Sequence, residues 1–291
     1  MSTARTIAVF GATGMQGGAV VDALLDRGAE VRALVRSPES DRAQALAGRG
    51  VELAYADADA PDSLSPALTG VDEFFLMTAP PGGMQTEDTE GETRQGRALA
   101  DAAIAASVPR IVYSSVGGAD RQSGVPHFES KRRVEEHLEG LDCRETFIRP
   151  VFFMDNFRHM GPALENGELV VRLPLPDDIK LQMIAVGDIG TVAAAALVGD
   201  VDIPGGAIEI AGDERTGSEI ARAFGEQTGL PARYEALPIA VLDGQHDMQA
   251  MFRWYAETPA MQADLDQVRR IAPDLVDLPT WLDEIGYAPS A

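Results

Sequence analysis

Short apolar runs alternate with amphipathic segments through the first half of the chain. The apolar run at 7–10 (IAVF) has the length of a strand. A helix follows it, whose apolar face consists of Val20, Val21, Leu24 and Leu25 and which stops at Gly28. Strand patterns cover 6–11, 31–35, 51–55, 73–78, 110–115 and 145–149, and the plainest further helices cover 91–107 and 129–140. Strands that alternate with helices predict an α/β fold with a parallel sheet covered on both faces.

After Pro150 the regular alternation fades. Pro174 and Pro176 mark loops. The pattern beyond them predicts a strand at 207–211 and helices at 188–198, 217–229, 246–257 and 279–285. We therefore expect a sheet domain over 1–150 and a smaller, mainly C-terminal α/β lobe over 151–291, whose segments can interleave with the sheet.

A glycine-rich sequence lies between the first predicted strand and the first predicted helix. It reads Gly11-Ala12-Thr13-Gly14-Met15-Gln16-Gly17. In that position the glycines place backbone N–H groups and a helix N-terminus around one point, where an anionic diphosphate fits. The alternative is an ordinary glycine-rich turn. We expect a Rossmann-type, doubly wound sheet with its ligand at the carboxyl ends of the strands.

The residues that follow the next strands bear on which nucleotide binds. Arg36, with Ser37 beside it, ends the second strand, where a base accommodates a 2′-phosphate, so NADP(H) is favoured over NAD(H). Asp57, with Ala58 beside it, is a candidate partner of the adenine amino group. Thr78-Ala79-Pro80 is expected to border the nicotinamide ribose. The alternatives are a solvated arginine, a helix-capping or turn acid, and a simple strand-ending loop.

Composition and charge narrow the class of partner. Of 291 residues, 45% are hydrophobic, which suffices for a sizeable core. The 46 acidic and 24 basic residues give a net charge of −22, which repels phosphate backbones, so we expect no direct nucleic-acid binding. Acidic residues scattered over the whole length favour a halophilic origin. A merely acidic mesophilic protein is the alternative.

Targeting signals and cysteine usage indicate a compartment. No apolar run approaches the roughly 18 residues that a membrane span needs, and the N-terminus lacks a signal-peptide pattern. The single cysteine, Cys143, excludes an internal disulfide and fits a reducing environment. We expect a cytoplasmic protein without a membrane partner, and we assign no metal ligands.

Several motifs together resemble one family. They are the glycine sequence, Arg36, Gln95-Gly96-Arg97, Ser114-Ser115, Phe152–Asn156, Met183–Gly190, Ile210–Glu214 and Met251–Trp254. Over nearly its full length the chain resembles the NmrA-like, or HSCARG-like, branch of the atypical short-chain dehydrogenases/reductases. The resemblance implies that NADP(H) is contacted by Gly11, Ala12, Thr13, Gly14, Met15, Gln16, Arg36, Asp57, Thr78, Ala79, Pro80, Lys131, Phe153, Met154, Asp155 and Asn156. It also implies that Arg94 occupies the family's basic position in the helix after the fourth strand.

The catalytic motif of the wider superfamily is incomplete here. That superfamily usually places Tyr-x-x-x-Lys on the helix after the fifth strand, and this chain has His127-Phe128-Glu129-Ser130-Lys131. The lysine is present and the tyrosine is absent. His127 is a candidate acid because positions four apart share a helix face and imidazole titrates near neutrality. The alternative is a surface histidine in a loop before the helix.

Two residues of the fifth strand are also considered. Ser114 is a candidate for orienting a carbonyl or the ribose, or else a buried, hydrogen-bonded serine. Strand alternation points Tyr113 away from the face of Ser114, which makes Tyr113 a poor substitute for the missing tyrosine.

The missing tyrosine affects the expected chemistry. A reduction that forms an alkoxide needs a positioned acid, whereas hydride addition to a quinone gives a hydroquinone anion whose conjugate acid has a pKa of about 10. An NADPH-dependent oxidoreductase acting on quinones or similarly activated electrophiles is therefore expected. The alternative is a non-catalytic NADP(H) redox sensor that acts through a protein partner. The partner is thus a small-molecule substrate or a protein, and the sequence leaves an oligomer possible.

Overall fold

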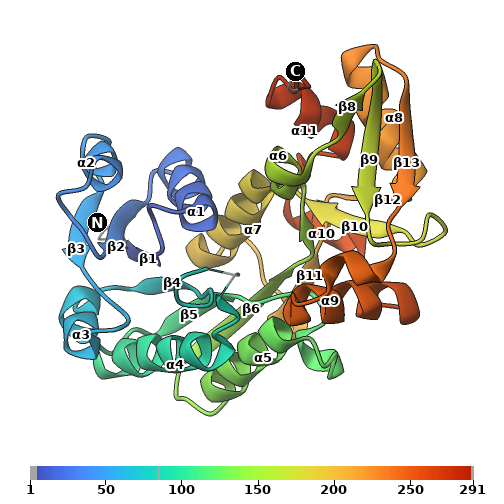
Figure 1. Ribbon diagram of the computed structural model, residues 1–291. Coiled ribbons are helices and arrows are strands. Elements are labelled where there is room, and N and C mark those ends of the chain that lie inside the picture. The colour runs from blue at the N-terminus through green and yellow to red at the C-terminus, as the bar shows by residue number, and fades with distance from the viewer. Residues whose placement is uncertain (1–4, 84–85, 290–291) are drawn as a thin grey trace.

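The computed structural model describes residues 5–83 and 86–289, and a seven-stranded parallel sheet forms its centre (Figure 1). In spatial order the strands are β11 (Ala207–Ile210), β6 (Arg144–Pro150), β5 (Arg110–Ser114), β4 (Glu73–Met77), β1 (Thr6–Phe10), β2 (Glu30–Val35) and β3 (Glu52–Tyr55). All neighbours pair in parallel. The strand order reverses between β1 and β4, which makes this a Rossmann-type, doubly wound sheet with its switch point there.

Helices cover both faces of the sheet, as the alternating pattern predicted (Figure 1). One face carries α1 (Met15–Asp26), α7 (Val186–Val198), α2 (Asp41–Ala47) and α10 (Leu265–Ile271). The other carries α3 (Leu64–Leu68), α4 (Thr89–Ala105) and α5 (Pro126–Glu139). In β4 the consecutive residues Phe74 and Phe75 are both fully buried, one in each layer, because neighbouring side chains of a strand point to opposite faces.

The second lobe has its own apolar core. Its two small sheets consist of β7 (Phe152–Phe153), β10 (Leu181–Ile184) and β12 (Asp213–Arg215), and of β8 (Ala163–Glu165), β9 (Glu168–Leu173) and β13 (Ala232–Ala236). Its helices are α6 (Phe157–Met160), α8 (Gly217–Thr228), α9 (His246–Glu257) and α11 (Leu278–Glu284). The rings of Phe157 and Phe224 meet edge to face at 5.4 Å inside this core. Most of its methionines and aromatic side chains are packed there.

The chain crosses between the two lobes more than once after Pro150. The strand β11 returns to pair with β6, and α7 packs on α1 beside the sheet. A Cβ atom at Gly190 would lie 2.4 Å from the carbonyl oxygen of Ala19, so glycine permits the two helices to touch backbone to backbone. Parts of the chain after residue 150, namely α7 and β11, therefore belong to the sheet domain and not to the second lobe. No helix within the two described ranges combines the length and apolar character of a bilayer span.

Candidate functional site

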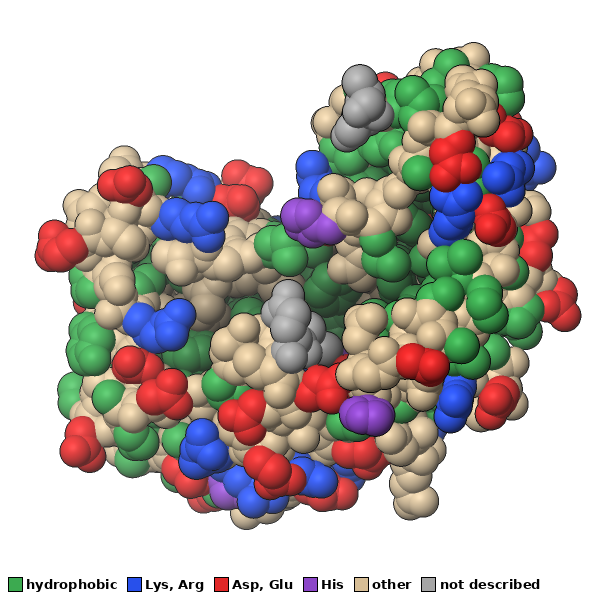
Figure 2. All heavy atoms as spheres, viewed as in Figure 1, with side chains coloured by type: hydrophobic (Ala, Val, Ile, Leu, Met, Phe, Trp, Pro, Cys, Tyr) green, Lys and Arg blue, Asp and Glu red, His purple; other side chains and the backbone are tan. Residues whose placement is uncertain are grey.

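The surface is hollowed between the two lobes, with hydrophobic side chains along the hollow (Figure 2). Three strands that surround the switch point, β1, β4 and β5, are followed or ended by Gly11, Thr78 and Ser114. Because the carboxyl ends of parallel strands meet at one edge, these residues border a common crevice. The structure thus brings the main predicted site segments to one edge of the sheet.

The glycine sequence forms a tight turn that packs against α1. Gly11 has a φ of +74°, a conformation that L side chains rarely adopt. A Cβ atom at Gly17 would lie only 2.2 Å from the carbonyl oxygen of Gly11, so this glycine is required by the contact of the helix with its own turn. A Cβ atom at Gly14 would lie 3.3 Å from the carbonyl oxygen of Gly11, which is a tight contact but a less severe one. Two of the three glycines are therefore explained by the local backbone itself.

The N-terminus of α1 presents unused backbone donors. Its N-cap is Gly14, with no side-chain cap and no acidic residue in the first turn. The N–H groups of Met15, Gln16 and Gly17 have no acceptor in the described part of the chain. Some other helix starts are capped by a side chain of their N-cap residue, for example by Ser40 on α2 and Thr216 on α8. The open end of α1 is thus suited to an external anion.

Four of the six arginines without a carboxylate partner follow β2 or lie on α4. Most arginines form ion pairs, whereas the arginines that have no carboxylate within 4.0 Å in the described part of the chain are Arg36, Arg42, Arg94, Arg97, Arg253 and Arg270. Arg36 and Arg42 follow β2, and Arg94 and Arg97 lie on α4. Figure 2 shows basic side chains over α1 and α2 beside the hollow. In a chain of charge −22, exposed guanidinium groups left unpaired are available to a phosphate.

The predicted adenine contact, Asp57, lies in a turn after β3. Its Oδ1 accepts the backbone N–H of Asp59 at 3.0 Å, and its own N–H donates to Ser63 Oγ at 2.9 Å. Ala58 is buried, and Ser37 at the end of β2 is exposed. The geometry of Asp57 is that of a turn acid, the alternative considered for it.

A buried polar network surrounds Lys131. Its Nζ donates to the carbonyl oxygen of Thr78 and to Glu92 Oε1, both at 2.8 Å. Glu92 has no exposed surface and also accepts hydrogen bonds from Thr78 Oγ1 and Ser130 Oγ. Burial by itself raises the pKa of Glu92, but the charge of Lys131 and these hydrogen bonds outweigh it and lower that pKa. Lys131 is therefore tied to the strand end that the sequence placed at the nicotinamide ribose.

The two β5 residues face opposite layers, as strand alternation predicted. Ser114 is 1% exposed, and its Oγ donates to Gln16 Oε1 at 2.7 Å, which joins the end of β5 to the first turn of α1. The Tyr113 hydroxyl lies 2.9 Å from Thr78 Oγ1, and burial raises the pKa of this phenol well above its usual value. Ser114 thus has the buried, hydrogen-bonded position that was the alternative to a ligand contact.

His127 is helical and buried. The helix α5 begins at Pro126, three residues before the predicted start, because proline is favoured in the first turn. His127 is 9% exposed, and its Nδ1 lies 2.5 Å from Oδ2 of Asp247 on α9. The surface-histidine alternative is therefore wrong.

The segment 153–156 runs from the end of β7 to the start of α6. Met154 is fully buried, whereas Phe153 and Asn156 are half-buried. Asp155 Oδ2 accepts the backbone N–H of Val186 at 2.9 Å at the start of α7, and Oδ1 accepts from Arg158 Nε at 3.3 Å. Ala79 is exposed and Pro80 is buried at the end of β4.

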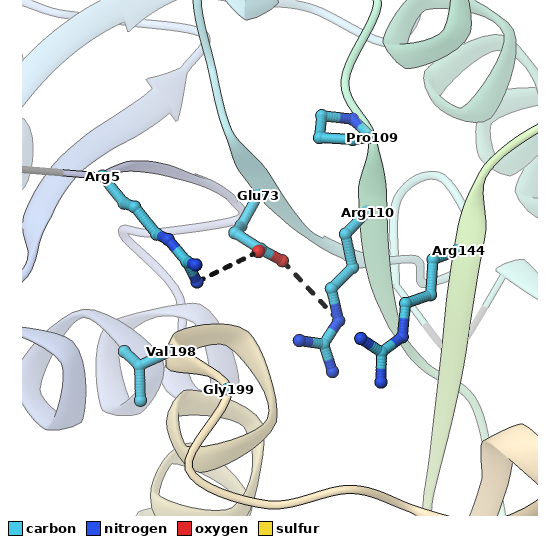
Figure 3. A pocket seen from close by; sticks show the side chains of 7 residues that line it. All are labelled: Arg5, Glu73, Pro109, Arg110, Arg144, Val198 and Gly199. Carbon is cyan, nitrogen blue, oxygen red and sulfur yellow. Dashed lines mark ion pairs between the residues drawn. The ribbon is translucent and has the colours of Figure 1, made fainter. Parts of the chain in front are cut away.

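A separate polar pocket of about 400 Å³ lies at the opposite, amino edge of the sheet (Figure 3). In it Arg5 and Arg110 point toward Glu73 from two sides, at 3.7 and 3.6 Å. Arg144, beside them, pairs with Asp202 at 2.8 Å. The basic groups of this pocket thus have carboxylate partners of their own, and it is remote from the crevice.

Two buried acids of the site were not singled out from the sequence. Glu92 shares a helical face with Gly96, Leu99 and Ala103, so a carboxylate within an apolar stripe was an available signal. Asp247 offered no such signal, because an acid in the first turn of a helix is ordinary.

The comparisons with known proteins agree with this architecture. The model of the NmrA-like family matches residues 3–285. An NAD(P)H azoreductase from Xenophilus azovorans is 32% identical over 238 residues, which cover 80% of this chain and 77% of the azoreductase. A crystal structure of an NADPH-dependent quinone oxidoreductase from Escherichia coli, complexed with NADPH, aligns with a TM-score of 0.82 at 26% identity and covers 97% of this chain and 100% of that one.

A regulatory protein shares the fold as well. The negative transcriptional regulator NmrA, crystallised with NADP, aligns with a TM-score of 0.81 at 21% identity and covers 97% of this chain and 95% of that one. The family match over almost the whole sequence, together with the azoreductase identity, decides the classification. This chain belongs to the NmrA-like family.

Proposed function

We propose that this chain is an NADPH-dependent oxidoreductase that passes hydride to quinone-like or other activated acceptors. The observation that carries the proposal is the uncapped N-terminus of α1 at the switch point, with the unpaired Arg36 after the neighbouring strand. The first provides backbone donors for a diphosphate and the second a guanidinium for a 2′-phosphate.

The residues of the crevice fit such a nucleotide. The turn from Gly11 to Gly17 would offer the free N–H groups at the start of α1 to the diphosphate, and Met15, 62% exposed, lies on the surface beside it. Arg94 is a further unpaired base on α4. The proposed contacts at Asp57, at 78–80 and at 153–156 rest on the family resemblance. When bound, NADPH supplies a hydride, that is, two electrons and one hydrogen.

The acceptor class follows from the residues at the superfamily's catalytic position. No tyrosine stands four residues before Lys131, and Lys131 is already paired with the buried Glu92. A quinone that takes up hydride becomes a hydroquinone anion, which then needs one proton from water or from a nearby acid. His127 is the proposed acid. The azoreductase and the quinone oxidoreductase similar to this chain support an acceptor of this kind.

In this proposal Lys131 and Ser114 position parts of the nucleotide site and do not react themselves. Lys131 holds the carbonyl oxygen of Thr78 and thereby the end of β4 beside the nicotinamide. Ser114 holds Gln16 and thereby the first turn of α1. The second lobe, mostly from 151–291, would carry the acceptor site, with α7 and β11 belonging to the nucleotide part. The lone Cys143 supports a cytoplasmic location.

Two assays test the proposal. A thermal-shift screen of NADPH, NADP⁺, NADH and NAD⁺ at low and high salt is expected to show the larger stabilisation with the phosphorylated pair. Steady NADPH oxidation with a panel of quinones and azo dyes is then expected. Tight NADPH binding without turnover, together with nucleotide-dependent capture of a protein, would instead support the redox-sensor alternative. That alternative has less support, since the regulator NmrA carries only the likeness of fold.

A further inference from the structure

One carboxylate joins the two lobes at the candidate acid. Asp247 lies in the first turn of α9, and His127 lies in the first turn of α5. Asp247 Oδ1 accepts the backbone N–H of His127 at 2.8 Å, and Oδ2 lies 2.5 Å from Nδ1 of the same residue. A single side chain therefore holds both the backbone and the ring of His127.

No other polar group of the described residues forms a hydrogen bond with the two atoms that meet between the His127 ring and Asp247. Both His127 Nδ1 and Asp247 Oδ2 are enclosed and lie 2.5 Å apart as an ion-pair contact, and neither atom forms a hydrogen bond of ordinary geometry in the described part of the chain. Asp247 is 2% exposed, and a carboxylate so buried requires a donor. Beside the backbone N–H of His127, the imidazole Nδ1 is the nearest nitrogen to this carboxylate, 2.5 Å from Oδ2.

The other charged groups near the pair do not replace this contact. Glu87, in the loop before α4, accepts the backbone N–H of Asp247 at 3.1 Å and leaves its carboxylate alone. Lys131, one turn further along α5, is directed to Glu92 and Thr78. The ring of Phe128 meets the imidazole edge to face at 4.5 Å and carries no charge.

We infer that Asp247 is a positioning residue, which fixes the tautomer and the orientation of His127 so that Nε2 is the proton-donating atom of the site. The inference rests on the proposed function. With Nδ1 enclosed 2.5 Å from Oδ2 of Asp247, Nε2 is the ring nitrogen left to exchange a proton. The side chain keeps 11% of its surface exposed, although Nδ1 is enclosed.

The proton step balances without a further reactant. The acceptor gains a hydride and becomes an anion, and Nε2–H of the imidazolium transfers its proton to that anion. The neutral imidazole keeps Nδ1–H on the ionised Asp247, and water returns a proton to Nε2. Asp247 itself neither gains nor loses a proton.

The test combines a readout of the ring with a readout of the reaction. Asp247→Asn keeps an acceptor oxygen for the His127 N–H but removes the charge. Nitrogen-15 NMR of histidine-labelled protein above neutral pH is expected to show Nδ1–H with a bare Nε2 in the unaltered protein. In D247N the opposite or a mixed tautomer is expected. Glu87→Gln, which alters a neighbour without touching the ring, serves as the control and should match the unaltered protein.

The kinetic arm uses NADPH oxidation with a quinone across a range of pH. D247N is expected to lower kcat at least about tenfold, with the KM for NADPH unchanged and the alkaline loss of turnover moved to lower pH. Thermal unfolding confirms that each variant is folded. A bare Nδ1 in the unaltered protein, or equal turnover in D247N and the unaltered protein, overturns the inference.

Failure of the proposed function is distinguishable from this outcome. If the unaltered protein reduces no acceptor, the proposed function fails. The role of His127 as proton donor then fails too, whichever tautomer the NMR experiment finds. If turnover is present and only the tautomer or the D247N profile disagrees, the oxidoreductase remains and the positioning role is rejected.

Discussion

Lys131 Nζ lies 2.8 Å from Oε1 of Glu92, a carboxylate with no exposed surface. The pair joins α5 to α4, and through the carbonyl of Thr78 it also fixes the end of β4. Removing one member of a buried pair leaves an uncompensated charge, which costs far more than replacing both members. The contact therefore matters for stability as well as for the shape of the crevice.

The first prediction follows from that asymmetry. Glu92→Leu should lower the free energy of unfolding by about 3–5 kcal/mol, because the Lys131 ammonium loses its counter-charge. The double variant E92L/K131M should be less destabilised than E92L alone. Urea unfolding of E92L, K131M and the double variant gives the free energies of a double-mutant cycle. Additive losses in the double variant would contradict an energetic coupling.

The second prediction concerns the turn before α1. Gly17→Ala should displace the helix start, because its Cβ would lie 2.2 Å from the Gly11 carbonyl oxygen, and both stability and NADPH affinity should fall. Gly18→Ala is the matched control. Its Cβ would meet Ala12 O at 3.6 Å, an ordinary contact, and alanine favours the helix. Thermal unfolding and NADPH titration of the two variants check this, and equal behaviour would show that the close approach is unimportant.

The central sheet could be predicted from the sequence because its strands are continuous apolar runs separated by helical periods. All six strands expected in the first half are present. The second lobe was harder, since β7, β8, β10 and β12 have only two to four residues each, and β7, β10 and β12 pair with strands far along the chain. Periodicity carries no signal over such lengths.

The candidate site shows the same division. The places of the glycine turn and of Arg36 at strand ends were predictable, because they depend only on neighbours in the sequence. The partners of Lys131 and His127 were not, because Glu92 and Asp247 come from other elements that only the fold brings together. The start of α5 at Pro126 also escaped the pattern, since a helix of low apolar content gives a weak boundary.

The third prediction addresses nucleotide choice. Arg36→Ala should weaken NADPH binding about tenfold or more and leave NADH binding almost unchanged, because only the 2′-phosphate uses the guanidinium. Isothermal titration with both nucleotides measures the ratio. Arg222→Ala, an exposed arginine on α8 in the second lobe, is the control and should change neither value. Equal losses for NADPH and NADH would remove the assignment of Arg36.

The fourth prediction is a pH dependence of stability at Asp188. This residue lies in the first turn of α7 and is 8% exposed. Burial raises the pKa of Asp188 to about 7, the charges of Glu284 and Asp155 add to the rise, and the hydrogen bond from the Val276 N–H offsets it only in part. Between the unfolded pKa near 4 and this value, the folded protein holds a proton that the unfolded chain lacks. The contribution of Asp188 to stability therefore falls as the pH rises from about 4 to about 7.

Asp188→Asn removes this titration and keeps an oxygen acceptor for Val276. The variant should be more stable than the unaltered protein at pH 8, by about 1–3 kcal/mol once the lost attraction to the α7 N-terminus is allowed for. The difference should shrink as the pH falls to 5, where Asp188 is protonated in the folded protein. Asp41→Asn, at an exposed acid in the first turn of α2, should give a small difference of similar size at both pH values. Chemical unfolding at pH 5 and pH 8 measures both, and a D188N difference that grows toward pH 5 would mean that the native carboxylate is ionised and stabilising.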